Sequence, residues 1–334
     1  MPAEARAPRV SVLVPCHDDA RTLDPALASI AAQDFADLEV VIADDASSDG
    51  SAAIAEAWAR RDPRFRALGN QRNLGMTANW NRALAAARGE LVAKLDADDA
   101  FAPEFLATLV PELERPPAPI AAFCRTLDCD EELRPVAEWA GEAALRSAGL
   151  DPAREHRLPG LAWLRLCFDD RQLWHSNALL VRSADLRALG GWDERWSCAA
   201  DTDLILRLLA TGRSATHLPL AGVRYRRRAA SVSARAAAEG WKAIESVLVG
   251  LEGIARLDRA TVLATPPLRR NWWRLWRALD GLLDDRERWR RAPGGERGPL
   301  AEIAARQAPP PLPVRMEGRL RDAVAGARRR WREA

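Results

Sequence analysis

The chain has 334 residues, 48% of them hydrophobic, so it can bury a large core and form one sizeable domain with an appendage. Its 49 basic and 47 acidic side chains nearly cancel, and the formal net charge of +2 excludes the strongly basic surface of a general nucleic-acid binder. We therefore expect no nucleic-acid partner.

The sequence contains no recognisable targeting segment. Its beginning, MPAEARAPRV, lacks the apolar run of a signal peptide, and no stretch reaches the ~18 uninterrupted apolar residues of a transmembrane helix. The five cysteines are scattered and show no CxxC spacing, which predicts reduced thiols. These features predict a cytoplasmic protein, and we expect residues 1–8 to be a flexible N-terminus.

Short β-branched runs alternate with Ala-rich amphipathic stretches between residues 9 and 95, which is the pattern of βαβ units in a buried parallel sheet. Each expected strand runs into a polar segment. Because ligands collect at the carboxyl ends of parallel strands, these segments should converge on one crevice. The expected strands are Val10–Val14, Leu38–Ala43, Phe65–Leu68 and Leu91–Leu95, and the expected helices lie near Thr22–Ala32, Ser51–Arg61 and Thr77–Ala87.

The regular pattern weakens farther along the chain. Residues 128–157 are polar and lack a clear period. Beyond residue 234 the composition becomes rich in Arg and Trp, so we expect an α/β catalytic domain over 9–234 and a helical C-terminal extension over 235–334. The expected elements of the second half of the domain are helices at Phe101–Leu113, Leu161–Phe168 and Asp203–Ala210 and strands near Ile120–Thr126 and Leu173–Val181.

A helix expected over Arg269–Leu283 is the main feature of the extension. Trp272, Trp276 and Leu279 share one of its faces, which favours packing against protein. A basic, Trp-bearing helix can also lie on an anionic membrane surface, although Asp280 opposes lipid binding. The extension could therefore support a homodimer or peripheral contact with the inner face of the membrane.

The strongest chemical signal is Asp96-Ala97-Asp98-Asp99, directly after an apolar strand. Clustered carboxylates repel one another, so this arrangement is favourable if a hard divalent cation is held there. Mg²⁺ or Mn²⁺ suits such carboxylates together with diphosphate oxygens. An Asp after a strand can also cap the next helix, which explains one of these residues easily and three of them poorly.

A second acidic segment, Asp44-Asp45 followed by ASSDG, also comes directly after a strand. A carboxylate at this point can accept hydrogen bonds from a nucleobase edge or a ribose. In the simpler interpretation the segment is a capped turn, with Ser48 or Asp49 capping the following helix. That interpretation does not require Asp44 or Asp45.

Together these motifs resemble the family 2 glycosyltransferases, inverting enzymes of the GT-A fold. The resemblance runs through VSVLVPCHDD, VVIADDASSDGS, NQRNLGMTANWNRALAAARGE, LDADD and GGWDERWSCAADTDLILRL, between residues 9 and 232. It implies a Rossmann-like mixed, mainly parallel sheet flanked by helices. It also implies inverting transfer of a sugar from a nucleotide-diphosphate sugar, with a UDP-sugar favoured, to a hydroxyl acceptor such as a glycan or lipid-linked glycan in cell-envelope polysaccharide biosynthesis.

On the donor side, the resemblance implies that Asp96 and Asp98 are the family's DxD pair. Asp98 would be the direct metal ligand, and Asp96 would be shared between ribose and metal. Other matched residues would border the phosphates, the base or the ribose. The implied nucleotide-sugar-binding residues are Pro15, Asp18 or Asp19, Asp44, Asp45, Arg72, Asn73, Gly75, Asn81 and Asp96.

Inverting transfer needs a general base opposite the leaving diphosphate. The resemblance gives this role to Asp201, which here follows Ala200 where relatives carry Glu. The like charge that would help to raise the pKa of the base is therefore missing. The alternative is structural, with Asp201 as an N-cap and Asp203 paired with Arg207.

The remaining candidates lie on either side of the transferred sugar. Arg226 and Arg228 could close over the diphosphate through forked hydrogen bonds, the alternative being a solvated basic loop. Relatives place a His near Arg228, so arginine charge could replace a third metal ligand here. His175, Asp193 and Glu194 are expected on the acceptor side, although His175 could equally be a packed residue.

The sequence lacks the motifs of two other nucleotide-binding enzyme classes. The first strand runs into PCHDD and not into the GxGxxG of dinucleotide-dependent oxidoreductases, and no GxxxxGK[ST] phosphate loop occurs. The rival to a glycosyltransferase is a catalytically weak nucleotide-sugar-binding or scaffold protein on the same fold.

Overall fold

The computed structural model describes residues 6–169, 173–228, 232–283, 290–292, 299–307, 309–311, 314–315, 318–319 and 322. The chain divides into two compact units, Met1–Ser231 and Val232–Ala334. Residues 1–5 of the expected flexible N-terminus lie outside the described residues, as do parts of the C-terminal extension.

The first unit is built on one sheet with the strand order β3-β2-β1-β4-β9-β6-β10-β5. The β3-β2-β1-β4 strands are parallel, as are β6 and β10, whereas β9 runs antiparallel to β4 and β6. The expected mainly parallel α/β sheet is confirmed. The strands are β1 (Val10–Cys16), β2 (Leu38–Asp44), β3 (Phe65–Gly69), β4 (Leu91–Lys94), β5 (Ala100–Phe101), β6 (Ala121–Cys129), β7 (Pro135–Glu138), β8 (His156–Pro159), β9 (Leu179–Arg182) and β10 (Ser214–Arg226).

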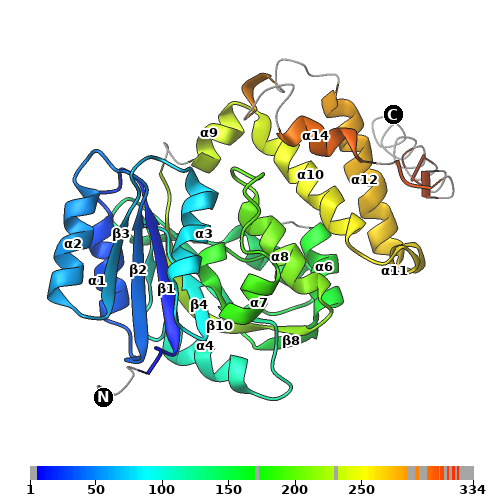
Figure 1. Cartoon of the computed structure of the whole chain (residues 1–334). Helices are drawn as coiled ribbons and strands as arrows, with labels where there is room; N and C mark the ends of the chain where they lie inside the picture. The colour runs from blue at the N-terminus through cyan, green and yellow to red at the C-terminus, as the bar shows by residue number, and fades with distance from the viewer. Residues whose placement is uncertain are drawn as a thin grey trace. The chain divides into compact units, whose positions relative to one another are not determined.

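Helices cover both faces of this sheet (Figure 1). Val12 of β1 faces a core with α1, α2 and α4, while Lys94 of β4 faces the opposite side with α3, α7 and α8. This division follows from the alternation of side chains along a strand. The helices are α1 (Leu23–Ala31), α2 (Ser51–Arg61), α3 (Met76–Ala86), α4 (Phe105–Glu114), α5 (Ala140–Ser147), α6 (Gly160–Asp169), α7 (Ser183–Ala188) and α8 (Ala200–Ala210).

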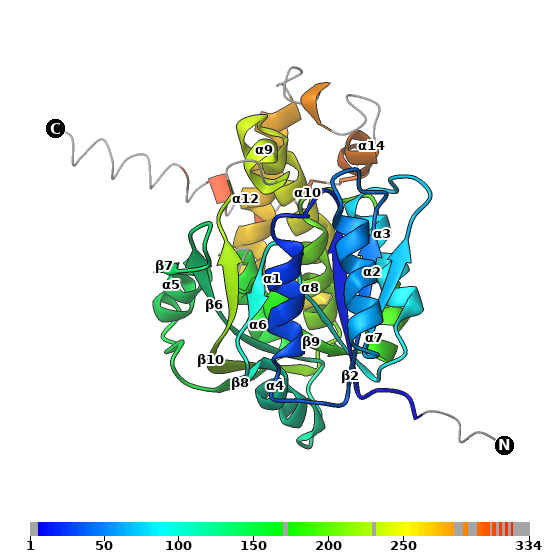
Figure 2. The same cartoon turned by 90° about the vertical axis from the view of Figure 1, so that its left-hand side faces the viewer.

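The sequence was least informative at one edge of the sheet. The region 128–157 contains β7, α5 and the start of β8, with β7 paired to β6 and β8 to β10 (Figure 2). The strand expected over Leu173–Val181 is shorter, because a 3-10 turn η1 (Ser176–Ala178) precedes β9. The side chain of His175 starts this turn by accepting a hydrogen bond from the amide of Asn177 at 3.3 Å. Such short elements depend on partners distant in sequence and not on local periodicity.

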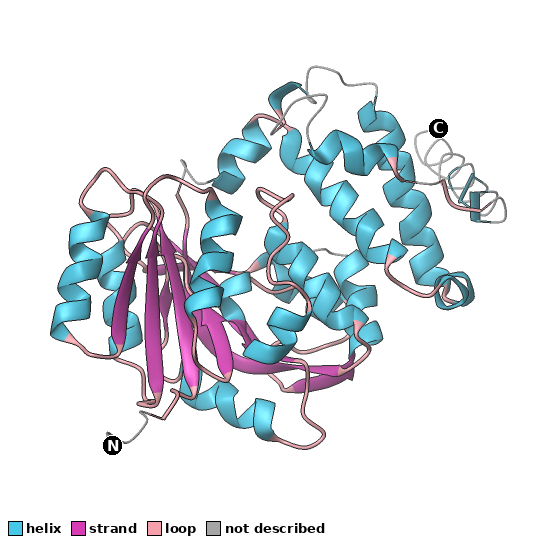
Figure 3. Ribbon diagram, in the orientation of Figure 1, coloured by secondary structure: helices cyan, strands magenta, loops and turns pink. Residues whose placement is uncertain are grey.

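The described residues of the second unit form helices and loops (Figure 3). Helix α12 buries Leu275, Leu279 and Trp273, whereas Trp272 and Trp276 are half-buried, so Leu279 is the fully buried member of the expected face. An aliphatic stripe at helical spacing takes the buried face. Across the described residues, no helix is both long and apolar enough to cross a membrane. The helices are α9 (Val232–Ala238), α10 (Trp241–Ala255), α11 (Arg259–Ala264), α12 (Pro266–Leu283) and α14 (Pro299–Ala305).

The close approach of the loop between α3 and β4 to β1 depends on Gly89. A Cβ atom built there would lie 2.5 Å from the backbone nitrogen of Ser11, whereas one at Gly69 would meet nothing within 4 Å. We expect Gly89→Ala to lower the free energy of unfolding by about 1–3 kcal/mol, because backbone atoms must move. Urea unfolding measures the change, with Gly69→Ala as the matched control. Equal midpoints for both variants would contradict the close approach.

Candidate active site

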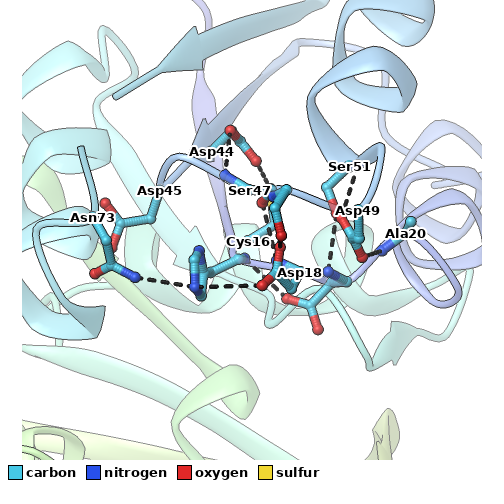
Figure 4. A network of polar contacts seen from close by, with 12 residues as sticks. Cys16, Asp18, Ala20, Asp44, Asp45, Ser47, Asp49, Ser51 and Asn73 are labelled. Atoms are coloured by element: carbon cyan, nitrogen blue, oxygen red, sulfur yellow. Dashed lines mark hydrogen bonds and ion pairs between the residues drawn. The ribbon is translucent and has the colours of Figure 1, made fainter. Parts of the chain in front are cut away.

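The loops after β1 and β2 are joined by hydrogen bonds at the carboxyl ends of the strands (Figure 4). The Oδ1 atom of Asp18 accepts from the amide of Ser48 at 2.7 Å, and the Asp18 amide donates to Ser47 Oγ at 3.0 Å. The Ser47 amide in turn donates to Asp44 Oδ2 at 3.2 Å. Asp18 and Asp44 therefore lie in one network, as the convergence of the loops predicted.

Helix α2 begins after Gly50, its N-cap residue, which has a φ of 101°. The Oδ1 atom of Asp49 accepts hydrogen bonds from the backbone amide of Ser51, the first residue of α2, at 3.0 Å and from Ser51 Oγ at 2.6 Å. Its Oδ2 atom accepts from the Ala20 amide at 2.8 Å. Of the two expected capping residues, Asp49 therefore bonds the start of α2, and it also joins the loop after β1 to this helix.

Asp45 fixes the loop from Asn70 to Gly75. It is 2% exposed and accepts from the side-chain amide of Asn70 at 2.6 Å and from the backbone amides of Leu74 at 2.8 Å and Gly75 at 3.0 Å. Its carboxylate is therefore satisfied by the protein itself. Asp45 shapes the loop that holds two of the expected nucleoside-binding residues.

The expected nucleoside-binding residues occupy two different places. Pro15 is buried in β1 beside Ala43, and the amide nitrogen of Asn73 lies 3.0 Å from His17 Nε2 at the end of β1. Arg72 is exposed on the same loop as Asn73. Asn81 lies elsewhere, on the α3 face turned toward residues 192–194.

Asp96, Asp99 and His175 form the acidic centre. Each offers a ligand atom, and these atoms lie within 4.8 Å of one another. Asp99 is fully buried and accepts from the Arg226 amide at 2.8 Å and from Asn177 Nδ2 at 2.6 Å. These bonds tie the end of β10 and the η1 turn to the loop after β4.

Arg228 lies between the loops after β1 and β4. Its Nη2 atom is 2.7 Å from Asp98 Oδ2, and its Nη1 atom donates to Asp19 Oδ1 at 3.3 Å. Burial and the charge of Asp96 raise the pKa of Asp98 to about 6, although Arg228 opposes the rise. Of the two expected acids, Asp19 lies beside Arg228, and Asp18 accepts a hydrogen bond from Ser48 in the loop after β2.

The two expected diphosphate arginines differ in what they contact. Arg226 is 7% exposed, and its Nε atom donates to the backbone oxygen of Asp98 at 2.7 Å. The side chain of Arg228 is 36% exposed. Arg228 is therefore the better placed of the two to meet a diphosphate, and Arg226 braces the DADD turn.

The residues present are suited to a divalent cation. Burial lowers the pKa of His175 to about 4, so its imidazole is neutral, as metal binding requires. The raised pKa of Asp98 reflects carboxylate crowding that a cation would relieve. Asp96 belongs both to this His-containing cluster and to the expected Asp96–Asp98 pair.

Asp201 is the second residue of α8, whose N-cap is Ala199, so its interpretation as a cap is wrong. Its Oδ1 atom accepts from Trp192 Nε1 at 3.2 Å, and its Oδ2 atom lies 4.0 Å from Lys94 Nζ. Burial raises the pKa of Asp201; the charge of Lys94 opposes this, and the charge of Asp96 adds to it. Asp96 thus supplies part of the neighbouring negative charge that a Glu at position 200 would supply in relatives and that Ala200 lacks.

The expected pair of Asp203 with Arg207 is present at 2.7 Å and is buried. Arg207 also donates to the backbone oxygens of Leu189 and Gly191, each at 2.8 Å. This arginine therefore holds the turn that leads into Trp192. Its role is structural.

Asn81 of α3 is bonded to residues 192–194, where the acceptor side is expected. The Nδ2 atom of Asn81 donates to the backbone oxygen of Trp192 at 2.8 Å and to Glu194 Oε1 at 2.9 Å. Asp193 pairs with Arg195 at 2.6 Å; burial opposes this ionisation, but the arginine keeps the pKa of Asp193 below its usual value. These contacts give Asn81 and Asp193 structural partners.

Sequence reasoning overlooked the part played by Lys94. It is 3% exposed and donates to Asp96 Oδ1 at 2.6 Å. A signal was present, because basic positions of this chain are otherwise almost all arginine, and here a lysine interrupts the apolar run LVAKL. The structural contacts of Asp99 and Asn177 had no comparable signal.

Part of the chain matches a model of a known protein family. Residues 11–166 match the model described as glycosyl transferase family 2. Over 104 residues the chain is 38% identical to a GalNAc(5)-diNAcBac-PP-undecaprenol beta-1,3-glucosyltransferase of Campylobacter jejuni, covering 31% of this chain and 34% of that protein. Over 120 residues it is 35% identical to the succinoglycan biosynthesis protein ExoO of Rhizobium meliloti, covering 36% and 34%. The chain thus spans about a third of the length of these curated relatives.

Solved structures share the fold. Staphylococcus aureus TarS in complex with UDP has a TM-score of 0.59 at 18% identity, covering 83% of this chain and 72% of that one. The mannosyltransferase PcManGT of Pyrobaculum calidifontis, in complex with GDP-Man and Mn²⁺, has a TM-score of 0.52 at 21% identity, covering 96% and 81%. The expected GT-A fold is confirmed.

The raised pKa of Asp98 predicts a pH-dependent stability. Its folded state binds the proton more tightly than the unfolded chain does, so stability falls as pH rises through about 4 to 6 and is level above that range. Asp98→Asn should therefore gain stability relative to wild type, by up to about 3 kcal/mol between pH ~4 and ~7. Urea unfolding in the presence of a chelator, repeated at several pH values, measures this difference. The variant also loses the contact with Arg228, which shifts its free energy of unfolding by a constant amount and does not make the difference from wild type depend on pH. If the free energies of unfolding of wild type and Asp98→Asn changed in parallel with pH, the raised pKa of Asp98 would be contradicted.

Proposed function

We propose that this chain, whose residues 11–166 match the model of glycosyl transferase family 2, transfers a sugar from a nucleotide-diphosphate sugar to a hydroxyl acceptor with inversion. The observation that carries this proposal is that Asp96 lies close to both Asp98 and Asp201, and that all three acids are half-buried. They come from the end of β4 and the start of α8; Lys94 lies beside Asp96 and Asp201, and Arg228 lies beside Asp98. One bound sugar could therefore meet Asp96 and Asp98 on the donor side and Asp201 on the acceptor side.

The donor would lie over the loops after β1, β2 and β3. We favour a UDP-sugar, and a structural neighbour is a complex with UDP. The loop held by Asp45 would form the nucleoside wall, with Arg72 and Asn73 beside the base. The exposed guanidinium of Arg228 would meet the diphosphate, and Arg226 would act only by supporting the DADD turn.

Asp96 and Asp98, with Asp99 and His175 adjacent, would hold Mg²⁺ or Mn²⁺. Such a cation offsets the charge that develops on a leaving diphosphate. One structural neighbour is a complex with GDP-Man and Mn²⁺. The positive charge of Arg228 acts in the same direction, because it already lies 2.7 Å from Asp98.

Asp201 would be the general base. As the acceptor oxygen bonds to the anomeric carbon, the hydroxyl proton passes to Asp201 and the bond from that carbon to the diphosphate breaks. The raised pKa of Asp201 makes its carboxylate a stronger base than an ordinary aspartate, and the Trp192 Nε1 bond orients one carboxylate oxygen. Attack from the face opposite the diphosphate inverts the anomeric configuration.

The acceptor would approach past His175 and residues 192–194. Relatives bear names of undecaprenol-linked glycan and succinoglycan synthesis, so we propose a glycan or lipid-linked glycan acceptor in cell-envelope polysaccharide synthesis. The protein would act in the cytoplasm. The extension over 235–334 would contribute peripheral membrane contact or a homodimer interface to the catalytic domain over 9–234.

Two substitutions separate the proposed roles. Asp201→Asn should lower turnover by about 10²–10⁴-fold while leaving the donor Kd with Mn²⁺ near normal, because the base does not hold the donor. Asp98→Ala should weaken Mn²⁺-dependent donor binding by about tenfold or more. Nucleoside diphosphate release and calorimetry measure the two effects. Asp185→Asn, on α7 in an ion pair with Arg213, is the control.

A donor panel, scored for nucleoside diphosphate release with glycan acceptors, tests the activity itself. Ala200 in place of the usual Glu is the feature that favours the alternative of a catalytically weak binding or scaffold protein. Tight nucleotide binding with Mn²⁺ but no release from any donor would support that alternative. Equal loss of donor binding in Asp201→Asn and Asp98→Ala would contradict the division of roles.

A further inference from the structure

Lys94 connects the two sides of the proposed reaction centre. It is the last residue of β4, and its ammonium donates to Asp96 Oδ1 at 2.6 Å and lies 4.0 Å from Asp201 Oδ2. Asp96 follows β4, whereas Asp201 belongs to α8, about a hundred residues later in the chain. One buried cation is therefore shared by carboxylates of different elements.

The surroundings leave the ammonium little freedom. Nζ lies 4.1 Å from the centroid of the Trp80 ring, and Trp80 contacts Trp192 edge to face at 5.7 Å. Trp192 then donates to Asp201 through Nε1 at 3.2 Å. These contacts close a ring from Lys94 through the two indoles to Asp201 and back, so the position of the carboxylate depends on both ends of the ring.

The floor of this ring is apolar. A cavity of about 10 Å³, enough for about one water molecule, lies beside Lys94 and Asp201 and is lined mainly by aliphatic side chains such as Val92 and Leu204. Charges act strongly on one another in such surroundings, because little water screens them. Removing the ammonium would take away the positive charge beside Asp201 Oδ2, while Trp192 would still hold Asp201 Oδ1.

We propose that Lys94 is a positioning residue for sugar transfer: its ammonium sets the spacing between Asp96 on the donor side and Asp201 on the acceptor side, so that Asp201 faces the reacting carbon. This inference rests on the proposed function. Lys94 acts through Asp201 and does not touch the substrate. A displacement of about 1 Å in such a group can cost about a hundredfold in rate, which gives the size of the effect.

A purely structural role makes a different prediction. If Lys94 only neutralises buried charge, its loss should loosen the whole site, and donor affinity, acceptor KM, turnover and melting temperature should all worsen together. Positioning instead predicts a selective fall in kcat. The ratio of the kcat change to the binding changes therefore separates the two roles.

The experiment compares Lys94→Met with Lys242→Met, which removes the chain's other lysine, on α10 in the second unit. Lys94→Met should lower kcat about a hundredfold, with the donor Kd in Mn²⁺ and the acceptor KM changed less than about threefold. Lys242→Met should match wild type. Lys94→Gln keeps a hydrogen-bond donor without the charge, and it decides the matter by the same measurements if the Met variant does not fold.

A double variant supplies the second readout. Lys94→Met combined with Asp201→Asn should be no slower than Asp201→Asn alone, since the lysine acts through that aspartate. Losses that multiply would overturn the positioning role, as would kcat values for Lys94→Met and Lys94→Gln equal to that of Lys242→Met. If wild-type protein releases no nucleoside diphosphate from any donor, the proposed function fails first and this inference fails with it.

Discussion

The structure of the site depends on neutralising three acids that follow one strand. Asp96, Asp98 and Asp99 are buried or half-buried together, and a buried carboxylate without a partner costs several kcal/mol. Lys94 meets the first, Arg228 meets the second, and donors from β10 and η1 hold the third. The position of β10 in the sheet is therefore tied to the charge balance of the loop after β4.

The loops of the proposed donor side are likewise held by hydrogen bonds within the protein. Asp18 and Asp45 direct their carboxylates to serines, an asparagine and backbone amides of neighbouring loops. Loops fixed by such bonds lose little further freedom on binding, which favours affinity. Part of the acidic character at these strand ends therefore serves the loops themselves, and only the remainder is available to a nucleotide.

The proposed acceptor side is held mainly by packed side chains, whereas the proposed donor side is held by carboxylates. Trp80 and Asn81 fasten the turn between α7 and α8 to α3, and Arg207 of α8 holds the start of the same turn. Asp201 emerges from this packed wall at the start of α8, while Asp96 belongs to the polar loops. Lys94 contacts both, so the proposed geometry of transfer depends on one side chain between the apolar wall and the polar loops.

The sequence by itself determined the α/β alternation, the parallel strands and the acidic segments at their ends, because hydrophobic period and turn chemistry are local properties of the chain. Tertiary structure alone decided which partner each acid has. Asp99 and the Arg226 amide are 127 positions apart, and Asn81 bonds residue 192 instead of the nucleoside loops. Such pairings depend on sheet order, strand register and the direction in which a side chain leaves its element, and no local pattern encodes these.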